Sequence, residues 1–104
     1  MTRRILITPK ANQDLDAIYN FIAQNNPDIA LKFFDAARQT FNQLAKNLGI
    51  GTIYEVSKQE LKGLRKWRVK KFDKYIILYC YSNDLIEIIR ILYAGRDILA
   101  ILEG

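Results

Sequence analysis

Cationic side chains are concentrated in one stretch of the chain, and they suggest the first chemistry to consider. The stretch from Lys58 to Lys74 holds eight lysines and arginines and two carboxylates, a net +6, whereas the whole chain of 104 residues has a net charge of +5. The remainder therefore sums to −1, so the positive charge is a local patch. Such a patch attracts polyanions or an acidic partner protein; its structural alternative is a solvated face that keeps the protein soluble.

A strand is predicted inside this patch, beginning at Lys66 and ending at Phe72. Because side chains alternate between the two faces of a strand, Trp67 points one way, and Arg68, Lys70 and Phe72 point the other way. We expect Trp67 to face the core and the two cations to share a solvent-facing side. The predicted binding residues of the patch are Arg65, Lys66, Arg68, Lys70 and Lys71.

Arg90 is a further cation, placed in an otherwise apolar stretch near the end of the chain. Counting by two puts it on the same side of a strand as Ile86 and Leu92. An arginine there either extends its head group to the rim or belongs to a functional surface. If its role is structural, Glu55 or Asp97 could pair with it. Both interpretations remain open from the sequence.

Several kinds of site are excluded by composition. The chain has no histidine and one cysteine, Cys80, so histidine-dependent nucleophiles and the common zinc sites cannot be built. Acid–base work would fall to carboxylates, lysines or tyrosines. We expect no metal and no cofactor, and we expect Cys80 to be a buried, reduced thiol.

The elements that must position these residues begin with a short strand, 4–8, and two helices. Thr8 and Asn26 are predicted N-caps, and each is followed by a proline suited to the first helical position. Apolar residues then recur at helical spacing to Ile22 in the first helix and to Leu48 in the second. Because the connection is short, the helices should form an antiparallel hairpin.

A three-stranded meander follows the helices. A weak edge strand is possible at 53–56, and the predicted strands are 66–72, 75–81 and 85–93, with a hairpin turn at Asp73-Lys74. The strand 75–81 is nearly all apolar, as expected of a central strand covered on both faces. Residues 97–102 form a last helical turn or a strand.

Helices segregated from mainly antiparallel strands indicate an α+β fold. We expect an N-terminal strand, an antiparallel helical hairpin packed on one face of a small sheet, the order β-α-α-β-β-β, and a single domain over residues 1–104. No apolar run approaches the about 20 residues of a membrane span, and no signal peptide is evident. These features and the single cysteine favour the cytoplasm, with no membrane partner.

Three segments together resemble the RelE/ParE superfamily of bacterial type II toxin–antitoxin systems, and the ParE branch most closely. They are TPKANQDLDAIYNFI in the first helix, LKGLRKWRVKKFDKYIILYCY in the meander, and IEIIRILYAGRDILAIL at the end. The resemblance covers nearly the whole chain. It departs from the ParE pattern where family members usually carry proline, here Asn47-Leu48, and often histidine, here Tyr93-Ala94.

The resemblance implies a partner and two alternative targets. The partner is an acidic antitoxin, ParD-like or of another family, whose C-terminal segment wraps the toxin. ParE-like members are associated with poisoning DNA gyrase and so blocking replication, whereas RelE-like members cut messenger RNA on the ribosome. A drifted, non-toxic member acting as a binding module is a third possibility.

The two branches predict different roles for the same cations. A metal-free nuclease needs cations for the phosphate and an acid or base near the 2′-hydroxyl. Arg68, Lys70 and Arg90 could supply the cations, but the tail after Gly95 has no tyrosine to complete the site. We therefore expect a non-enzymatic, plasmid-stabilisation type of toxin. The residues expected to contact target or antitoxin are Arg65, Lys66, Arg68, Lys70, Lys71, Arg90 and Arg96.

Overall fold

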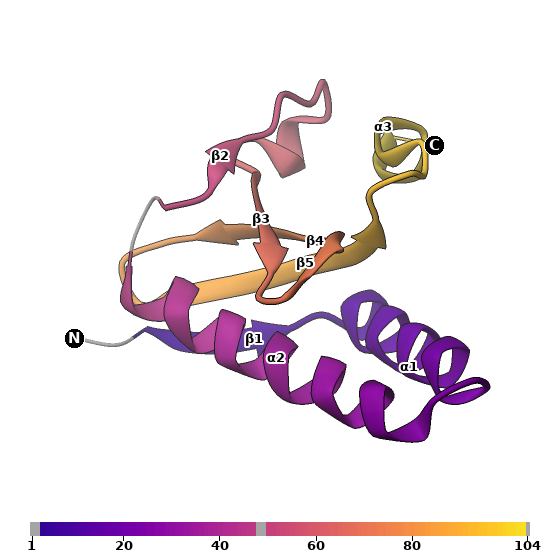
Figure 1. Ribbon diagram of the computed structural model, residues 1–104. Coiled ribbons are helices and arrows are strands. Elements are labelled where there is room, and N and C mark those ends of the chain that lie inside the picture. Colours follow the sequence, from indigo (N-terminus) through magenta and orange to yellow (C-terminus); the bar gives the residue numbers. More distant parts are fainter. Residues whose placement is uncertain (1–2, 48–49, 104) are drawn as a thin grey trace.

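A five-stranded sheet organises the part of the chain that the computed structural model describes, residues 3–47 and 50–103 (Figure 1). The strand order is β1-β5-β4-β3-β2. The only parallel pair among the described strands joins β1 to β5. The strands are β1 (Arg4–Ile7), β2 (Thr52–Ile53), β3 (Arg65–Val69), β4 (Phe72–Tyr81) and β5 (Leu85–Tyr93). The predicted α+β fold with a mainly antiparallel sheet is confirmed.

The two long helices, α1 (Pro9–Ala23) and α2 (Pro27–Lys46), begin at the predicted caps. The Thr8 hydroxyl accepts the N–H of Ala11 at 3.1 Å, and the Asn26 side chain accepts the N–H of Ile29 at 3.2 Å. Each bond satisfies one of the backbone donors that a helix leaves free in its first turn. The predicted helix end near Leu48 falls outside the described residues.

The α1–α2 hairpin covers one face of the sheet, the helical face (Figure 1). Phe33, at the centre of this core, is fully buried and packs edge-to-face against Phe72 and Tyr75. Trp67 also packs against this core, as its place in the strand predicted. The buried members from the sheet are Val69, Ile77, Tyr79, Ile86, Ile88 and Ile91.

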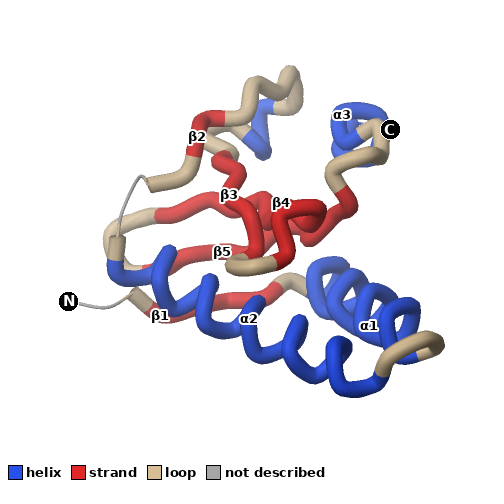
Figure 2. Tube along the Cα trace, viewed as in Figure 1, coloured by secondary structure: helices blue, strands red, loops and turns tan. Residues whose placement is uncertain are grey.

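The opposite face of the sheet, here called the second face, is covered by two short elements. These are the 3₁₀ turn η1 (Gln59–Leu61) and the helix α3 (Ile98–Glu103), which lie on the side away from the hairpin (Figure 2). Their side chains pack on Leu78 and Leu92. The Glu103 carboxylate accepts hydrogen bonds from the N–H and hydroxyl of Ser57, joining the two elements. The prediction that β4 is covered on both faces is therefore confirmed, and the last element is a helix.

The turn between β3 and β4 differs from the prediction. It lies at Lys70-Lys71 rather than Asp73-Lys74, because Val69 pairs directly with Phe72. The prediction that Phe72 shares a face with Arg68 is wrong for the same reason: the new turn places the Phe72 ring in the helical-face core. Burying this aromatic ring stabilises the fold more than the turn preference of an Asp-Lys pair.

The expected edge strand at 53–56 is shorter and earlier, since β2 contains only Thr52 and Ile53. The N–H of Tyr54 still donates to the carbonyl of Leu64 at 2.8 Å. The side chains of Tyr54 and Val56 pack on the second-face core. The prediction that Cys80 is buried holds in part, because its side chain is half-buried; burial and then the nearby Glu87 raise the pKa of its thiol.

A β-bulge in β5 makes the predicted facing of Arg90 only partly right: Arg90 shares a face with Leu92, as predicted, but not with Ile86. Leu78 of β4 pairs with Arg90, but the next residue, Tyr79, pairs with Ile88, so Ile89 is an extra residue. An inserted residue reverses the alternation beyond it. Ile88 consequently belongs to the helical face, whereas Leu92 belongs to the second face.

Candidate functional site

The outer edge of β3 is only partly covered by β2. Thr52 pairs with Lys66 and Ile53 with Arg65, and no described strand pairs with the outer edge of β3 beyond Lys66. Just before β2, two hydrogen bonds fix the backbone of Gly51. Its N–H donates to the Tyr79 hydroxyl at 2.9 Å, and its carbonyl accepts from Arg65 Nη1 at 2.6 Å. The second half of β3 is therefore an open sheet edge.

A groove of about 720 Å³ runs along this open edge, between β3 and α2. Its rim carries three of the predicted cations, Lys66, Arg68 and Lys70, and one carboxylate, Asp73. An open strand edge beside a basic rim offers both backbone hydrogen bonds and charge to an extended acidic segment. The other lining residues are Gln39, Gln43, Thr52, Trp67, Val69 and Ile76. We call this feature the β3-edge groove.

One buried hydroxyl fixes the position of the hairpin turn at the end of the groove. The Thr40 hydroxyl donates to the carbonyl of Ala36 at 2.7 Å and accepts the N–H of Lys70 at 3.0 Å. Thr40 is 1% exposed, so this bond is shielded from water. Lys71, the other turn residue, has a φ of 67° in the left-handed region. The turn is thus tied to α2, and its two lysines are exposed at a defined place.

Arg65 and Lys66 lie against aromatic rings at the other end of β3. The guanidinium carbon of Arg65 lies 5.6 Å from the centroid of the Tyr81 ring, and Arg3 contacts the same ring at the same distance. Lys66 Nζ lies 5.4 Å from the centroid of the Tyr54 ring. Such cation–π contacts hold the side chains over the rings and leave their charge at the surface.

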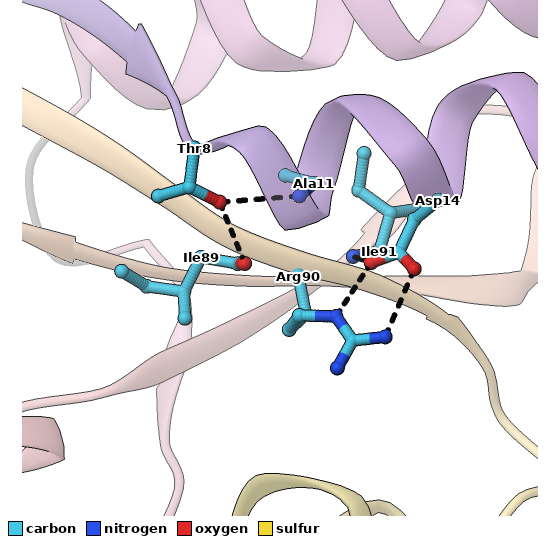
Figure 3. Close-up of polar contacts among 6 residues, drawn as sticks. All are labelled: Thr8, Ala11, Asp14, Ile89, Arg90 and Ile91. Carbon is cyan, nitrogen blue, oxygen red and sulfur yellow. Dashed lines mark hydrogen bonds and ion pairs between the residues drawn. The ribbon is translucent and has the colours of Figure 1, made fainter.

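Arg90 has a carboxylate partner that the sequence did not suggest, Asp14 of α1 (Figure 3). Arg90 Nε donates to Asp14 Oδ2 at 2.8 Å, and Nη2 donates to Oδ1 at 3.0 Å. Asp14 Oδ2 also accepts the N–H of Ile91 at 3.0 Å. The hydrogen bonds and charge of Asp14 raise the pKa of Arg90. The expected pairing with Glu55 or Asp97 is therefore wrong.

Asp14 accepts a backbone hydrogen bond at the edge of β5, where a longer β1 would otherwise pair. β1 ends at Ile7, so no described strand lies beside the edge of β5 beyond Ile88. The first turns of α1 cover this edge: the Thr8 hydroxyl donates to the carbonyl of Ile89 at 3.0 Å, and Asp14 accepts from Ile91 (Figure 3). Arg90 then compensates the charge of a carboxylate that is 13% exposed.

A second, smaller hollow of about 160 Å³ lies on the second face, beside Arg90. Two further cations line it, Lys10 from α1 and Lys58 from the start of η1. The remaining lining is apolar and comes from Leu61, Ile89, Ile101 and Leu102. We call this feature the Arg90 hollow.

The predicted binding residues therefore do not form one site. Lys66, Arg68 and Lys70 share the β3-edge groove, and Arg90 lines the separate Arg90 hollow. The other three lie elsewhere: Arg65 beside Gly51 and Tyr81, Lys71 at the tip of the turn, and Arg96, exposed, between β5 and α3. In particular, the three cations proposed for phosphate chemistry are split between two cavities.

Two tyrosines of the helical-face core, Tyr75 and Tyr79, are poor candidates for proton transfer. Burial, and then Tyr93, raise the pKa of Tyr75. Burial also raises the pKa of Tyr79, although its bond to Gly51 and the charge of Arg65 oppose the shift. Both phenols therefore stay protonated at neutral pH. Within the described ranges, no group of three or more carboxylates and cysteines is arranged to hold a metal ion.

Asp14, Lys10, Lys58 and Thr40 are the site residues that sequence reasoning missed. Asp14 did leave a signal, because it lies three residues after Ala11 and directly before Leu15, two buried residues of α1. A carboxylate inside a buried stripe requires a partner. Lys58 begins the basic stretch, but no sequence signal indicates that it meets Lys10, because the two are 48 residues apart and come together only in the fold.

Comparison with known proteins places the chain among small bacterial toxins. A family model described as "ParE toxin of type II toxin-antitoxin system, parDE" matches residues 5–98. No curated protein sequence matches significantly. The described helices also include none long and apolar enough to cross a bilayer.

Solved structures show the same fold at low sequence identity. A chain of the chromosomal ParDE system from P. aeruginosa superposes with a TM-score of 0.70 at 22% identity, covering 90% of this chain and 98% of that one. The YoeB dimer from Staphylococcus aureus gives 0.58 at 20% identity, with coverages of 89% and 98%. YafQ from E. coli gives 0.56 at 18% identity, with coverages of 98% and 99%.

Proposed function

Because the chain belongs to the ParE toxin family of type II toxin–antitoxin systems, we propose that it inhibits DNA gyrase by binding. In this proposal the protein acts in the bacterial cytoplasm, blocks replication and needs no cofactor. An acidic antitoxin neutralises it. The observation that carries the proposal is the family match over most of the chain, combined with a basic groove along an open strand edge.

The β3-edge groove fits an extended, acidic segment of an antitoxin. An extended segment could add its backbone to the open edge of β3, while its carboxylates meet Lys66, Arg68 and Lys70. Such a disordered acidic segment would be steered by charge and held by burial against Trp67 and Ile76. Several structural neighbours are toxin–antitoxin complexes, among them RelBE2 from Mycobacterium tuberculosis and YoeB–YefM from Staphylococcus aureus.

The division of the cations favours inhibition by binding over RNA cleavage. A metal-free nuclease must gather its cations around one phosphate. Here Arg68 and Lys70 line one cavity and Arg90 lines another, where Asp14 already balances its charge. The alternative function is a ribosome-dependent endoribonuclease, and the test must distinguish it from gyrase inhibition.

The test uses purified gyrase and a charge-reversal pair in the groove. We expect the protein alone to inhibit supercoiling of plasmid DNA and the Arg68→Glu/Lys70→Glu variant to inhibit much more weakly. Like charges across an interface cost several kcal/mol, and each 1.4 kcal/mol is about tenfold in affinity. A matched control, Lys32→Glu/Lys62→Glu, changes the same amount of charge at exposed sites outside both cavities and should inhibit like the wild type.

Two results would contradict the proposal. One is a folded wild-type protein that leaves gyrase activity unchanged at all concentrations. The other is cleavage of messenger RNA in a purified translation system, which would move the chain to the nuclease class. If the groove and control variants weaken inhibition equally, gyrase inhibition stands and the groove is not the surface responsible.

A further inference from the structure

The Arg90 hollow is built by four segments that are distant in the sequence. Lys10 comes from the first turn of α1, Lys58 and Leu61 from the η1 segment, and the rest from β5 and α3. In Figure 1, α1 lies on one side of β5 and α3 lies on the other side. The hollow therefore exists only in the folded chain, and its cations are placed by the tertiary structure.

The guanidinium of Arg90 is held in a fixed orientation at this hollow. Asp14 binds it through Nε and Nη2, and Figure 3 shows the remaining nitrogen, Nη1, turned away from Asp14. Asp14 itself is not among the residues that line the hollow. An arginine oriented in this way presents its free N–H donors without losing further side-chain entropy on binding.

The charges near the hollow leave a positive balance. Among the side chains that the structure describes, the cations are Lys10, Lys58 and Arg90, and the carboxylates that interact with them are Asp14 and Glu103. Both carboxylates are already engaged, Asp14 by Arg90 and Ile91, and Glu103 by Ser57 and by the charge of Lys58. The two lysines have no comparable carboxylate partner within hydrogen-bond distance among the described residues.

We propose that the Arg90 hollow binds a single phosphate group, either free phosphate or the terminal phosphate of a nucleotide. Arginine supplies a planar donor fork, and the lysines supply compact charges, a combination suited to a tetrahedral oxyanion. The apolar walls formed by Leu61, Ile89, Ile101 and Leu102 lower the local dielectric and strengthen these contacts. This site goes beyond gyrase inhibition and does not depend on it.

The test is a titration of the full chain with sodium phosphate, followed by amide NMR at constant ionic strength. We expect saturable shifts confined to amides near Lys10, Lys58 and Arg90. The Lys10→Gln/Lys58→Gln variant should bind at least about tenfold more weakly, because two charge-assisted contacts are lost. A matched control, Lys32→Gln/Lys74→Gln, removes two exposed lysines outside the hollow and should bind like the wild type.

Two further arms identify the source of the phosphate group. A nucleoside diphosphate that binds more tightly than phosphate would identify a nucleotide, and equal binding would identify free phosphate; either result supports the site. Shifts that are absent, that do not saturate, or that persist unchanged in the Lys10→Gln/Lys58→Gln variant would overturn the proposal. We expect both variants to keep near-wild-type thermal stability without phosphate, and this measurement separates lost binding from misfolding.

Discussion

Asp14 and Arg90 lie 76 residues apart and form a two-point ion pair that closes the edge of the sheet. The same carboxylate accepts the N–H of Ile91, so the pair links the first helix to the last strand. Arg90 is consequently a structural residue, whatever it also binds. Reversing its charge to test function would set two carboxylates against each other and disturb the fold.

Removing Asp14 should therefore destabilise the protein. Asp14→Ala leaves Arg90 without its partner and the N–H of Ile91 without an acceptor. We expect the free energy of unfolding to fall by about 3 kcal/mol, as for other largely buried pairs that lose one member. Urea denaturation measures the change. Asp16→Ala, at an exposed position of the same helix, should change stability by less than about 0.5 kcal/mol; equal effects would show that the pair contributes nothing special.

Gly51 should not tolerate a side chain. A Cβ at this position would lie 2.2 Å from the Tyr79 hydroxyl and 2.8 Å from the carbonyl oxygen of Lys66. Because the second contact is with backbone, Gly51→Ala should cost about 2–3 kcal/mol. The double variant Gly51→Ala/Tyr79→Phe should recover only part of this loss in thermal unfolding. Complete recovery would mean that the backbone contact is not limiting.

Replacing Lys71 with glycine should make the folded protein more stable. Its φ of 67° costs an L-residue about 1–2 kcal/mol, which glycine avoids. Glycine also gains entropy when unfolded, so Lys71→Gly should stabilise the protein by a net of about 0.5–1 kcal/mol. Lys70→Gly, its neighbour in the turn, should not stabilise. A destabilised Lys71→Gly variant in the same denaturation assay would contradict the assigned turn.

The contact between α3 and the η1 segment should weaken in acid. Hydrogen bonds from the hydroxyl and N–H of Ser57 lower the pKa of Glu103 below its ordinary value. The contact therefore stabilises α3 above the ordinary carboxyl range and is lost as the pH falls through the lowered pKa. Hydrogen exchange of the α3 amides should accelerate over that window in the wild type. Ser57→Ala removes the hydroxyl bond and keeps the N–H bond, so it should reduce this pH dependence; an unchanged profile would argue against the hydroxyl contact.

Local sequence signals predicted the elements well, and non-local contacts account for the errors. Thr8-Pro9 and Asn26-Pro27 located both helix starts because capping is local chemistry. The β5 bulge and the Lys70-Lys71 turn depend on partners elsewhere, such as Phe33 packing on Phe72. The alternation of side chains, read from the sequence of a strand, cannot reveal an inserted residue.

The candidate site shows the same difference between local signals, which the sequence reveals, and non-local contacts, which it does not. The sequence located the basic patch, and Lys66, Arg68 and Lys70 do line one groove. It could not separate Arg90 from them, because the separation depends on Asp14 in α1 and on the residues of η1 and α3 that enclose the Arg90 hollow. It also could not show the groove, which arises where a short β2 leaves the edge of β3 open beside α2.

The most direct test of gyrase inhibition is pulse labelling in a bacterium minutes after this protein alone is induced. Thymidine and methionine incorporation are followed side by side, with the Arg68→Glu/Lys70→Glu variant expressed at the same level. We predict that DNA synthesis falls first while translation continues, and that the variant delays this fall. If translation collapses first, gyrase inhibition is the wrong function and the chain acts on protein synthesis.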